Sequence, residues 1–190
     1  MTIDEILQKL ERGNQRFVSD KSDRKSQVGC KKHETVKGQK PYAIILSCSD
    51  SRVIPELIFD TGLCELFVVR IAGNVASNSA IASIEYAVSI LGSKVIMVLG
   101  HESCGAVSAA IKGGDHGKNL NQLLAHIAPA LKALPQNANV NDVVKKNAEL
   151  SAKELLNSSF IITKAVENKS IKIVTAFYHL SSGKVDFMDL

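Results

Sequence analysis

Short runs of apolar residues recur along the chain, and stretches whose apolar positions repeat at helical spacing separate them. The runs occupy residues 42–47, 66–69, 95–100 and 171–178. They are rich in branched side chains and too short to span a membrane, so they predict buried strands of a parallel sheet. A turn at Ser181-Ser182-Gly183 and the short run 185–188 predict an antiparallel edge hairpin. The pattern therefore predicts an α/β fold with a mostly parallel central sheet of four to five strands flanked by helices.

The first helix is predicted at the amino terminus. Thr2 and Glu5 have the spacing of a capping box, and the apolar residues that follow fall on one helical stripe up to Gly13. Further helical patterns cover residues 55–59, 79–91, 104–112, 120–134 with a break at Pro129, 140–157 and 160–168. The polar, lysine-rich segment from about residue 19 to residue 40 has little periodicity, which predicts a mobile loop or an extended arm leading into the sheet. We expect one domain over residues 1–190, in which the helix and arm of residues 1–40 pack on a partner subunit.

Length and composition restrict the class of protein. A chain of 190 residues buries roughly 70% of its unfolded surface and needs no disulfides to fold. No apolar run approaches about 18 residues, and the first residues carry acids in place of the lysines of a secretory signal. The net charge is +4, and no nucleic-acid motif accompanies the basic residues. These features predict a cytoplasmic protein whose partners include neither a membrane nor a nucleic acid.

Two polar stretches follow two of the predicted strands, at the point where each strand ends. They are Cys48-Ser49-Asp50-Ser51-Arg52 and His101-Glu102-Ser103-Cys104-Gly105. Functional crevices of open α/β sheets lie outside the carboxyl ends of the strands, so we expect the two stretches to meet. Zinc in catalytic sites commonly has three protein ligands, and Cys48, His101 and Cys104 supply thiolates and an imidazole. The sequence therefore predicts a zinc site.

Each of these ligands, taken alone, is more often a buried core residue, and the His-x-x-Cys spacing is a weak signal. Their joint position after two buried strands favours a metal site, as does a helix starting at Cys104, whose N-terminus would stabilise a thiolate. Because this pattern is more typical of a metal site than of a disulfide framework, we interpret all four cysteines as reduced. A cysteine phosphatase built on Cys48 is excluded, since Arg52 follows too closely for the usual phosphate loop.

Asp50 and Arg52 predict a second chemical element of the site. A zinc ion that carries two thiolates is nearly neutral overall and acidifies a bound water less than one held by histidines. Asp50 can accept a hydrogen bond from that water or hydroxide and orient it, while Arg52 keeps the carboxylate ionised. Asp50 can alternatively occupy the fourth zinc position and close the site. The less specific interpretation of the two residues is a surface ion pair.

The two stretches, together with the residues around them, resemble those of the beta-class carbonic anhydrases. The likeness extends through Gly13-Asn14-Gln15-Arg16-Phe17, Gly38-Gln39-Lys40-Pro41, Phe67-Val68-Val69-Arg70, Ala72-Gly73-Asn74, Ile84-Glu85-Tyr86-Ala87-Val88 and Gly105-Ala106-Val107. The resemblance implies zinc ligands at Cys48, His101 and Cys104, a catalytic dyad of Asp50 and Arg52, and a backbone N–H of Gly105 beside the substrate.

The resemblance also implies a substrate pocket that is shared between subunits. Gln39, Phe67 and Tyr86 match the family's substrate-pocket positions and look like those of the plant-type subgroup. In that subgroup some of these positions come from the neighbouring subunit of an obligate dimer, and the family includes tetramers and larger assemblies. We therefore expect a homodimer or a larger homo-oligomer whose site is open at neutral pH.

The activity implied by the resemblance is the reversible hydration of carbon dioxide to bicarbonate and a proton, by attack of zinc-bound hydroxide. The alternatives are a carbon disulfide or carbonyl sulfide hydrolase on the same scaffold, and a non-catalytic zinc-stabilised binding module. The presence of both Asp50 and Arg52 counts against the binding module. Ile71 and Glu102 depart from residues that are frequent in the family, and we expect them to tune the rate or its pH response. Cys30 and Cys64 match no functional position and are expected to be free thiols.

Overall fold

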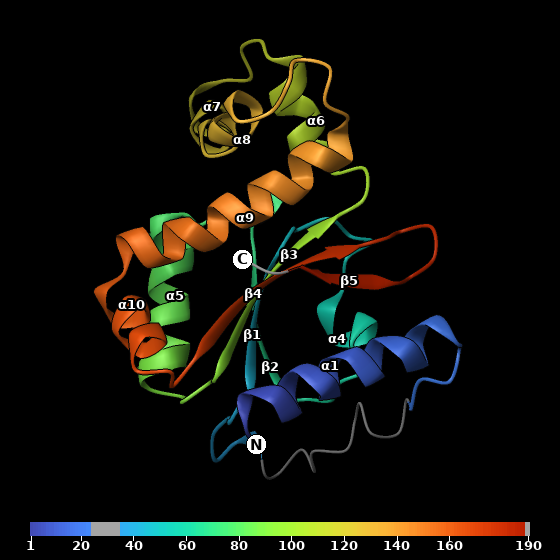
Figure 1. Cartoon of the computed structure of the whole chain (residues 1–190), viewed down its shortest axis with the longest axis vertical. Coiled ribbons are helices and arrows are strands. Elements are labelled where there is room, and N and C mark those ends of the chain that lie inside the picture. The colour runs from blue at the N-terminus through green and yellow to red at the C-terminus, as the bar shows by residue number, and fades with distance from the viewer. Residues whose placement is uncertain (24–34, 189–190) are drawn as a thin grey trace.

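A five-stranded sheet in the order β2-β1-β3-β4-β5 forms the centre of the computed structural model, which describes residues 1–23 and 35–188 (Figure 1). The strands are β1 (Ala43–Ser47), β2 (Leu66–Arg70), β3 (Val95–His101), β4 (Lys172–Tyr178) and β5 (Val185–Met188). The first four are parallel to one another, and β5 pairs antiparallel with β4. The predicted α/β fold class and its edge hairpin are confirmed.

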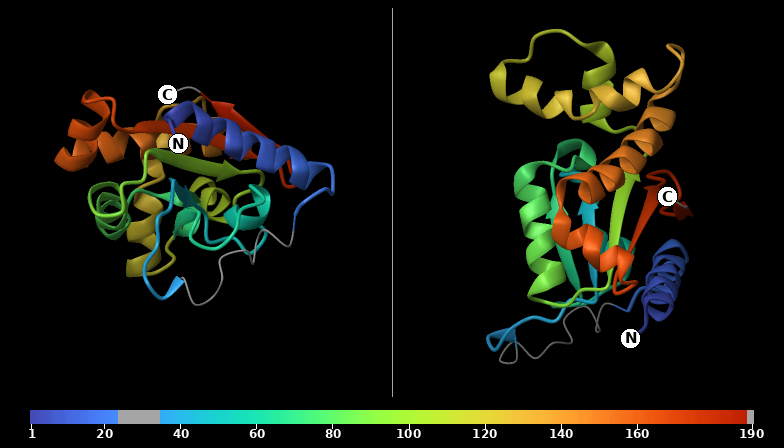
Figure 2. Two further views of the ribbon diagram at one scale, coloured as in Figure 1. Left: turned by 90° about the horizontal axis from the view of Figure 1, so that it is seen from below. Right: turned by 60° about the vertical axis from the view of Figure 1, so that its left-hand side comes forward.

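Helices cover both faces of this sheet. The helices that the structure describes are, in chain order, α1 (Ile3–Val18), α4 (Pro55–Ile58), η1 (Ala72–Asn74), α5 (Asn78–Ser89), α6 (Gly105–Lys112), α7 (Lys118–Ala125), α8 (Ala128–Lys132), α9 (Val140–Ser158) and α10 (Phe160–Glu167), of which α6, α7 and α8 lie beyond the carboxyl ends of the strands (Figure 1). On one face α5, α9 and α10 pack over Ile44 and Leu46 of β1, and on the other α1 and α4 pack over Ile45 (Figures 1 and 2). Because successive residues of a strand point to opposite faces, β1 and β3 are buried along their whole length.

The amino-terminal helix α1 packs on the sheet of its own chain. The predicted capping box between Thr2 and Glu5 is present. Ile6 and Leu10 of its apolar stripe are buried in the cluster that includes the side chains of β1 and β3. An apolar stripe in a sequence does not specify whether a helix packs on its own chain or on a partner. Here Ile6 and Leu10 pack on the sheet of their own chain. The packing of residues 1–40 on a partner subunit therefore stays a prediction for their remaining surface.

The predicted helix over residues 120–134 is divided into α7 and α8, and the break lies before Pro129 and not at it. Pro129 stands in the first turn of α8, where its missing N–H costs no helical hydrogen bond. Of the predicted arm, residues 24–34 with Cys30 lie outside the described residues. Over 1–23 and 35–188, no helix is both long enough and apolar enough to cross a membrane.

Gly13 lies where α1 crosses the end of α4. A Cβ atom at this position would lie 1.9 Å from the backbone carbonyl oxygen of Phe59, so any larger side chain forces the two segments apart. We expect Gly13→Ala to lower the free energy of unfolding by about 3 kcal/mol, although alanine has the higher helix propensity. Urea unfolding measures this, with Gly105→Ala as the control because its Cβ would meet nothing within 4 Å. Equal unfolding midpoints for the two variants would contradict this packing.

Candidate metal centre

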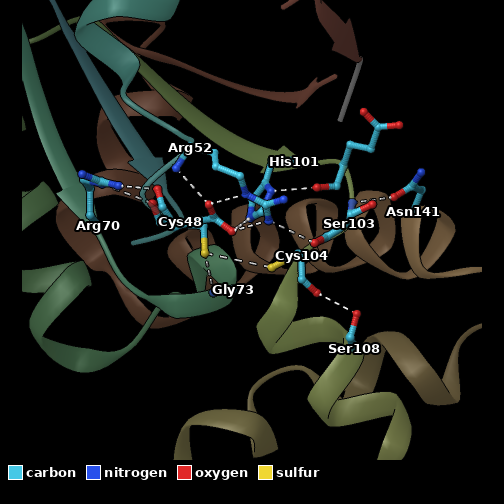
Figure 3. Close-up of polar contacts among 11 residues, drawn as sticks. Cys48, Arg52, Arg70, Gly73, His101, Ser103, Cys104, Ser108 and Asn141 are labelled. Atoms are coloured by element: carbon cyan, nitrogen blue, oxygen red, sulfur yellow. Dashed lines mark hydrogen bonds and ion pairs between the residues drawn. The ribbon is translucent and has the colours of Figure 1, made fainter. Parts of the chain in front are cut away.

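Cys48, His101 and Cys104 come together at the carboxyl ends of two neighbouring strands (Figure 3). Cys48 follows β1 directly, His101 is the last residue of β3, and Cys104 is the N-cap of α6. The chain passes from β1 to β2 on one side and then returns across β1 to β3, so the strand order reverses here. This is the place where open α/β sheets form their crevices. Ser103 makes the turn between His101 and Cys104 with a positive φ of 54°.

The donor atoms of the three residues fit a zinc ion. They all lie within 4.8 Å of one another, and the Sγ atoms of Cys48 and Cys104 are 4.0 Å apart. A tetrahedral ion with Zn–S bonds of about 2.3 Å separates two sulfur atoms by about 3.8 Å. Nδ1 of His101 lies 2.9 Å from the carbonyl oxygen of Glu102, to which it donates, so Nε2 keeps its lone pair. That buried Nε2 atom has no hydrogen-bond partner among the described residues, which is what a metal ligand requires.

The two thiols differ in acidity. A hydrogen bond from Cys104 lowers the pKa of Cys48 against the opposing effect of burial, and His101 and the Gly73 N–H contribute to the same shift. The same hydrogen bond, together with burial, raises the pKa of Cys104. One thiolate is therefore stable at neutral pH, and a bound cation is what would allow the second thiol to lose its proton.

Asp50 and Arg52 form a bidentate ion pair beside the cluster. Nε and Nη2 of Arg52 lie 2.9 and 2.7 Å from the two carboxylate oxygens of Asp50, and the Arg52 backbone N–H also donates to Oδ1 at 2.9 Å. These hydrogen bonds hold the pKa of Asp50 well below its usual range, so the carboxylate is ionised at neutral pH. Oδ2 of Asp50 lies 3.9 Å from Nε2 of His101. The closed arrangement, with Asp50 as the fourth zinc ligand, differs from this geometry and stays a prediction.

Gly105 lies beside the cluster, whereas the other predicted pocket residues lie away from it. Gly105 begins α6, directly after the third ligand. Gln39 is exposed and precedes β1, at the opposite end of that strand from Cys48. Phe67 lies within β2 and Tyr86 on α5, with ring centroids 6.2 Å apart, and Tyr86 is 46% exposed. One chain thus does not bring Gln39, Phe67 and Tyr86 to its own metal ligands.

Arg70 contacts the site, although the sequence alone predicted no role for it. Its Nε atom donates to the carbonyl oxygen of Cys48 at 3.2 Å, and its Nη2 atom donates to the carbonyl oxygen of Asp50 at 2.7 Å. The guanidinium therefore fixes the backbone that carries both a ligand and the carboxylate (Figure 3). The sheet register explains its position, because Arg70 ends β2 opposite Ser47, the last residue of β1. A charged residue at the end of a strand neighbouring the site is the signal that points to it.

Ile71 and Glu102, the two residues that depart from the family pattern, each make contacts near the site. Ile71 packs against two clusters of buried apolar residues. The Glu102 carboxylate accepts the N–H of Ser181 at 3.0 Å and so ties the ligand-bearing turn to the β4–β5 hairpin. Their expected effects on rate and pH response remain to be measured. Cys64 is a free, half-buried thiol, as predicted. The cytoplasmic location expected from reduced cysteines stays a prediction.

Comparison with known proteins identifies the family. The family model described as carbonic anhydrase matches residues 43–185, which is most of the chain. The chain belongs to the carbonic anhydrase family. It is therefore an enzyme of the family whose general activity is the hydration of carbon dioxide. The match includes all three candidate ligands as well as Asp50 and Arg52.

Curated relatives and solved structures agree with this assignment. Carbonic anhydrase 2 of Mycobacterium tuberculosis is 36% identical over 186 residues, covering 95% of this chain and 90% of that protein. The carbonic anhydrase of Mycolicibacterium smegmatis is 35% identical over 184 residues, covering 93% and 89%. A beta-carbonic anhydrase of Aspergillus fumigatus has a TM-score of 0.73 at 26% identity, covering 94% and 88%. A tetrameric beta-carbonic anhydrase of Sordaria macrospora has a TM-score of 0.77 at 23% identity, covering 98% of each chain. The fold is that of the beta class.

The contacts of Arg70 can be tested within this family's reaction. We expect Arg70→Met to lower kcat for carbon dioxide hydration about tenfold while the zinc content is unchanged, because Asp50 loses a fixed backbone but keeps Arg52. Stopped-flow kinetics with metal analysis measures both quantities. Arg16→Met is the control, since Arg16 pairs with Asp60 away from the site. A wild-type kcat in Arg70→Met would show that its two hydrogen bonds do not position the site.

Proposed function

We propose that the chain is a zinc enzyme that converts carbon dioxide and water reversibly to bicarbonate and a proton. The observation that carries this proposal is the position of the Asp50 carboxylate, held ionised by Arg52, beside the cluster of Cys48, His101 and Cys104. A purely structural zinc site needs no such ion pair. Similarity to curated carbonic anhydrases over nearly the whole chain supports the same conclusion.

Each side chain has its own part in the proposed reaction. Cys48, His101 and Cys104 would hold a zinc ion, which lowers the pKa of a water molecule and so supplies a hydroxide nucleophile near neutral pH. Asp50 accepts the O–H of the attacking oxygen and turns its lone pair toward carbon dioxide. It can accept only while it is ionised, and the hydrogen bonds from Arg52 keep it so. The proton released in the reaction passes to buffer.

We propose that a second copy of the chain completes the substrate pocket. The rings of Phe67 and Tyr86 would form an apolar wall for carbon dioxide, and the Gln39 amide and the Gly105 N–H would donate to substrate oxygens. Two observations support a shared pocket: Gln39, Phe67 and Tyr86 lie away from the ligands of their own chain, and the related Sordaria macrospora enzyme is tetrameric. Residues 1–40 would add to the contact between the copies. Sedimentation that finds a fully active monomer would contradict this part of the proposal.

A substrate panel separates the proposed activity from its rivals. We expect zinc-loaded protein to hydrate carbon dioxide well above the uncatalysed rate and to leave carbon disulfide and carbonyl sulfide largely unreacted. Preferential hydrolysis of either sulfur compound would assign the chain to the alternative activity on the same scaffold. A protein that binds one zinc per chain and acts on none of the three substrates would be a zinc-stabilised binding module.

A further inference from the structure

Helix α9 supports the candidate metal centre from outside it. At the start of the helix, the Asn141 side chain accepts the N–H of Ser103 at 3.0 Å. Further along, Val144 packs so closely on β3 that a Cβ at Gly100 would lie 2.7 Å from its Cγ1 atom. One turn later, the Asn147 amide donates to the carbonyl oxygen of Gly73 at 2.8 Å. One helix thus contacts the chain at three points on the two segments that flank the ligands, the end of β3 with its following turn and the η1 turn.

Of these contacted residues, Gly73 is the one that is hydrogen-bonded to a metal ligand. Its backbone N–H donates to the Sγ atom of Cys48 at 3.3 Å. Its φ of 70° is accessible to glycine at little cost, and a Cβ here would lie 2.9 Å from the Cδ1 atom of Ile127. Gly73 is therefore confined by Ile127 on one side and is hydrogen-bonded to Cys48 through its N–H. Asn147 fixes the carbonyl of Gly73, which belongs to the peptide group on the other side of its Cα atom.

Asn147 is suited to hold the Gly73 carbonyl because both residues are buried. Its side chain is 1% exposed, and Gly73 is buried as well. A buried carbonyl oxygen that loses its hydrogen-bond partner destabilises the fold, so the Gly73 carbonyl stays hydrogen-bonded to the Asn147 amide. We propose that Asn147 is a positioning residue of the metal centre, which holds the Gly73 N–H on the Cys48 sulfur. The role in the metal centre rests on the proposed function.

The hydrogen bond to sulfur has an electronic consequence. An N–H that points at a thiolate withdraws electron density from the sulfur and stabilises its negative charge. If Asn147 no longer holds the Gly73 carbonyl, the backbone at Gly73 can shift, its N–H moves off the Cys48 sulfur, and the sulfur becomes a more electron-rich donor. A merely structural asparagine would affect the free energy of unfolding and leave the electronic state of the sulfur unchanged.

Cobalt spectroscopy distinguishes these roles. We expect cobalt-loaded Asn147→Ala to show its sulfur-to-cobalt charge-transfer band at longer wavelength than the wild type, and to bind the metal about tenfold more weakly. Asn14→Ala is the matched control, because Asn14 is also buried and donates to two backbone carbonyl oxygens, those of Ile58 and Gly183, away from the site. This control should lose stability in urea and keep both the band and the affinity. An unshifted band in Asn147→Ala, or equal shifts in both variants, overturns the proposal.

A second measurement needs no variant and covers the case in which Asn147→Ala fails to fold. In the wild-type protein loaded with NMR-active cadmium, the Gly73 amide proton should show a scalar coupling to the metal through the Cys48 sulfur. Absence of this coupling overturns the proposal. Neither readout depends on hydration of carbon dioxide, so a failure here is distinguishable from a failure of the proposed function.

Discussion

Cys104→Ala is expected to reduce bound zinc from one per chain to a trace and to bring carbon dioxide hydration down to the uncatalysed rate. Cys104 supplies one of three buried donor atoms that lie within 4.8 Å of one another. With it gone, two protein ligands remain, fewer than the three that catalytic zinc sites commonly use. Metal analysis after dialysis, followed by stopped-flow kinetics, measures both effects.

The control for this variant is another cysteine. Cys64 is a free thiol outside the cluster, so Cys64→Ala should keep one zinc per chain and the wild-type rate. Circular dichroism of both variants shows whether each is folded. A folded Cys104→Ala protein that retains stoichiometric zinc would remove this residue from the ligand set.

Asp50→Asn is expected to keep its zinc and to lose activity by about 10²-fold. The substitution preserves the size of the side chain but replaces an acceptor oxygen with an N–H donor, and it removes the charge that binds Arg52. The attacking oxygen then loses the acceptor that orients it. The measurement is kcat together with zinc content. Asp115→Asn is the control, because hydrogen bonds also lower the pKa of this carboxyl, which is exposed and outside the cluster.

The pH profile adds a second readout for Asp50. Its hydrogen bonds to Arg52 lower its pKa in the folded state, so the pair stabilises the protein above the ordinary carboxyl pKa and loses this effect only on strong acidification. Asp50 therefore stays ionised across the neutral range. We expect the rate of Asp50→Asn to fall at every neutral pH without a change in the midpoint of the profile. A variant that keeps its zinc and the wild-type rate would contradict the role of Asp50.

The central part of the site could be predicted because it depends on strand ends. A run of branched residues indicates a buried strand, parallel strands in an open sheet place their carboxyl ends at one edge, and the ligand-type residues after β1 and β3 therefore had to meet. The spacing of Asp50 and Arg52 within one short stretch similarly places their side chains near each other. These inferences use only local pattern and one topological rule.

The supporting contacts could not be predicted in the same way. Asn147 and Gly73 are 74 positions apart and meet through a side-chain to backbone bond, which has no periodicity and no motif. Arg70 carried a weak signal, because its position depends on the register of β2 against β1. The packing of α1 on the sheet of its own chain could not be predicted for another reason. A stripe of apolar residues indicates that one face of a helix is buried. It does not indicate which surface buries it.

The proposed zinc-dependent activity is tested most directly by a zinc titration of metal-free protein, with the carbon dioxide hydration rate measured by stopped flow after each addition. We expect a rate that rises in proportion to bound zinc and reaches its plateau at one zinc per chain, because the chain's described residues bring together the single cluster of Cys48, His101 and Cys104. A hydration rate that stays at the uncatalysed level when one zinc per chain is bound would contradict it.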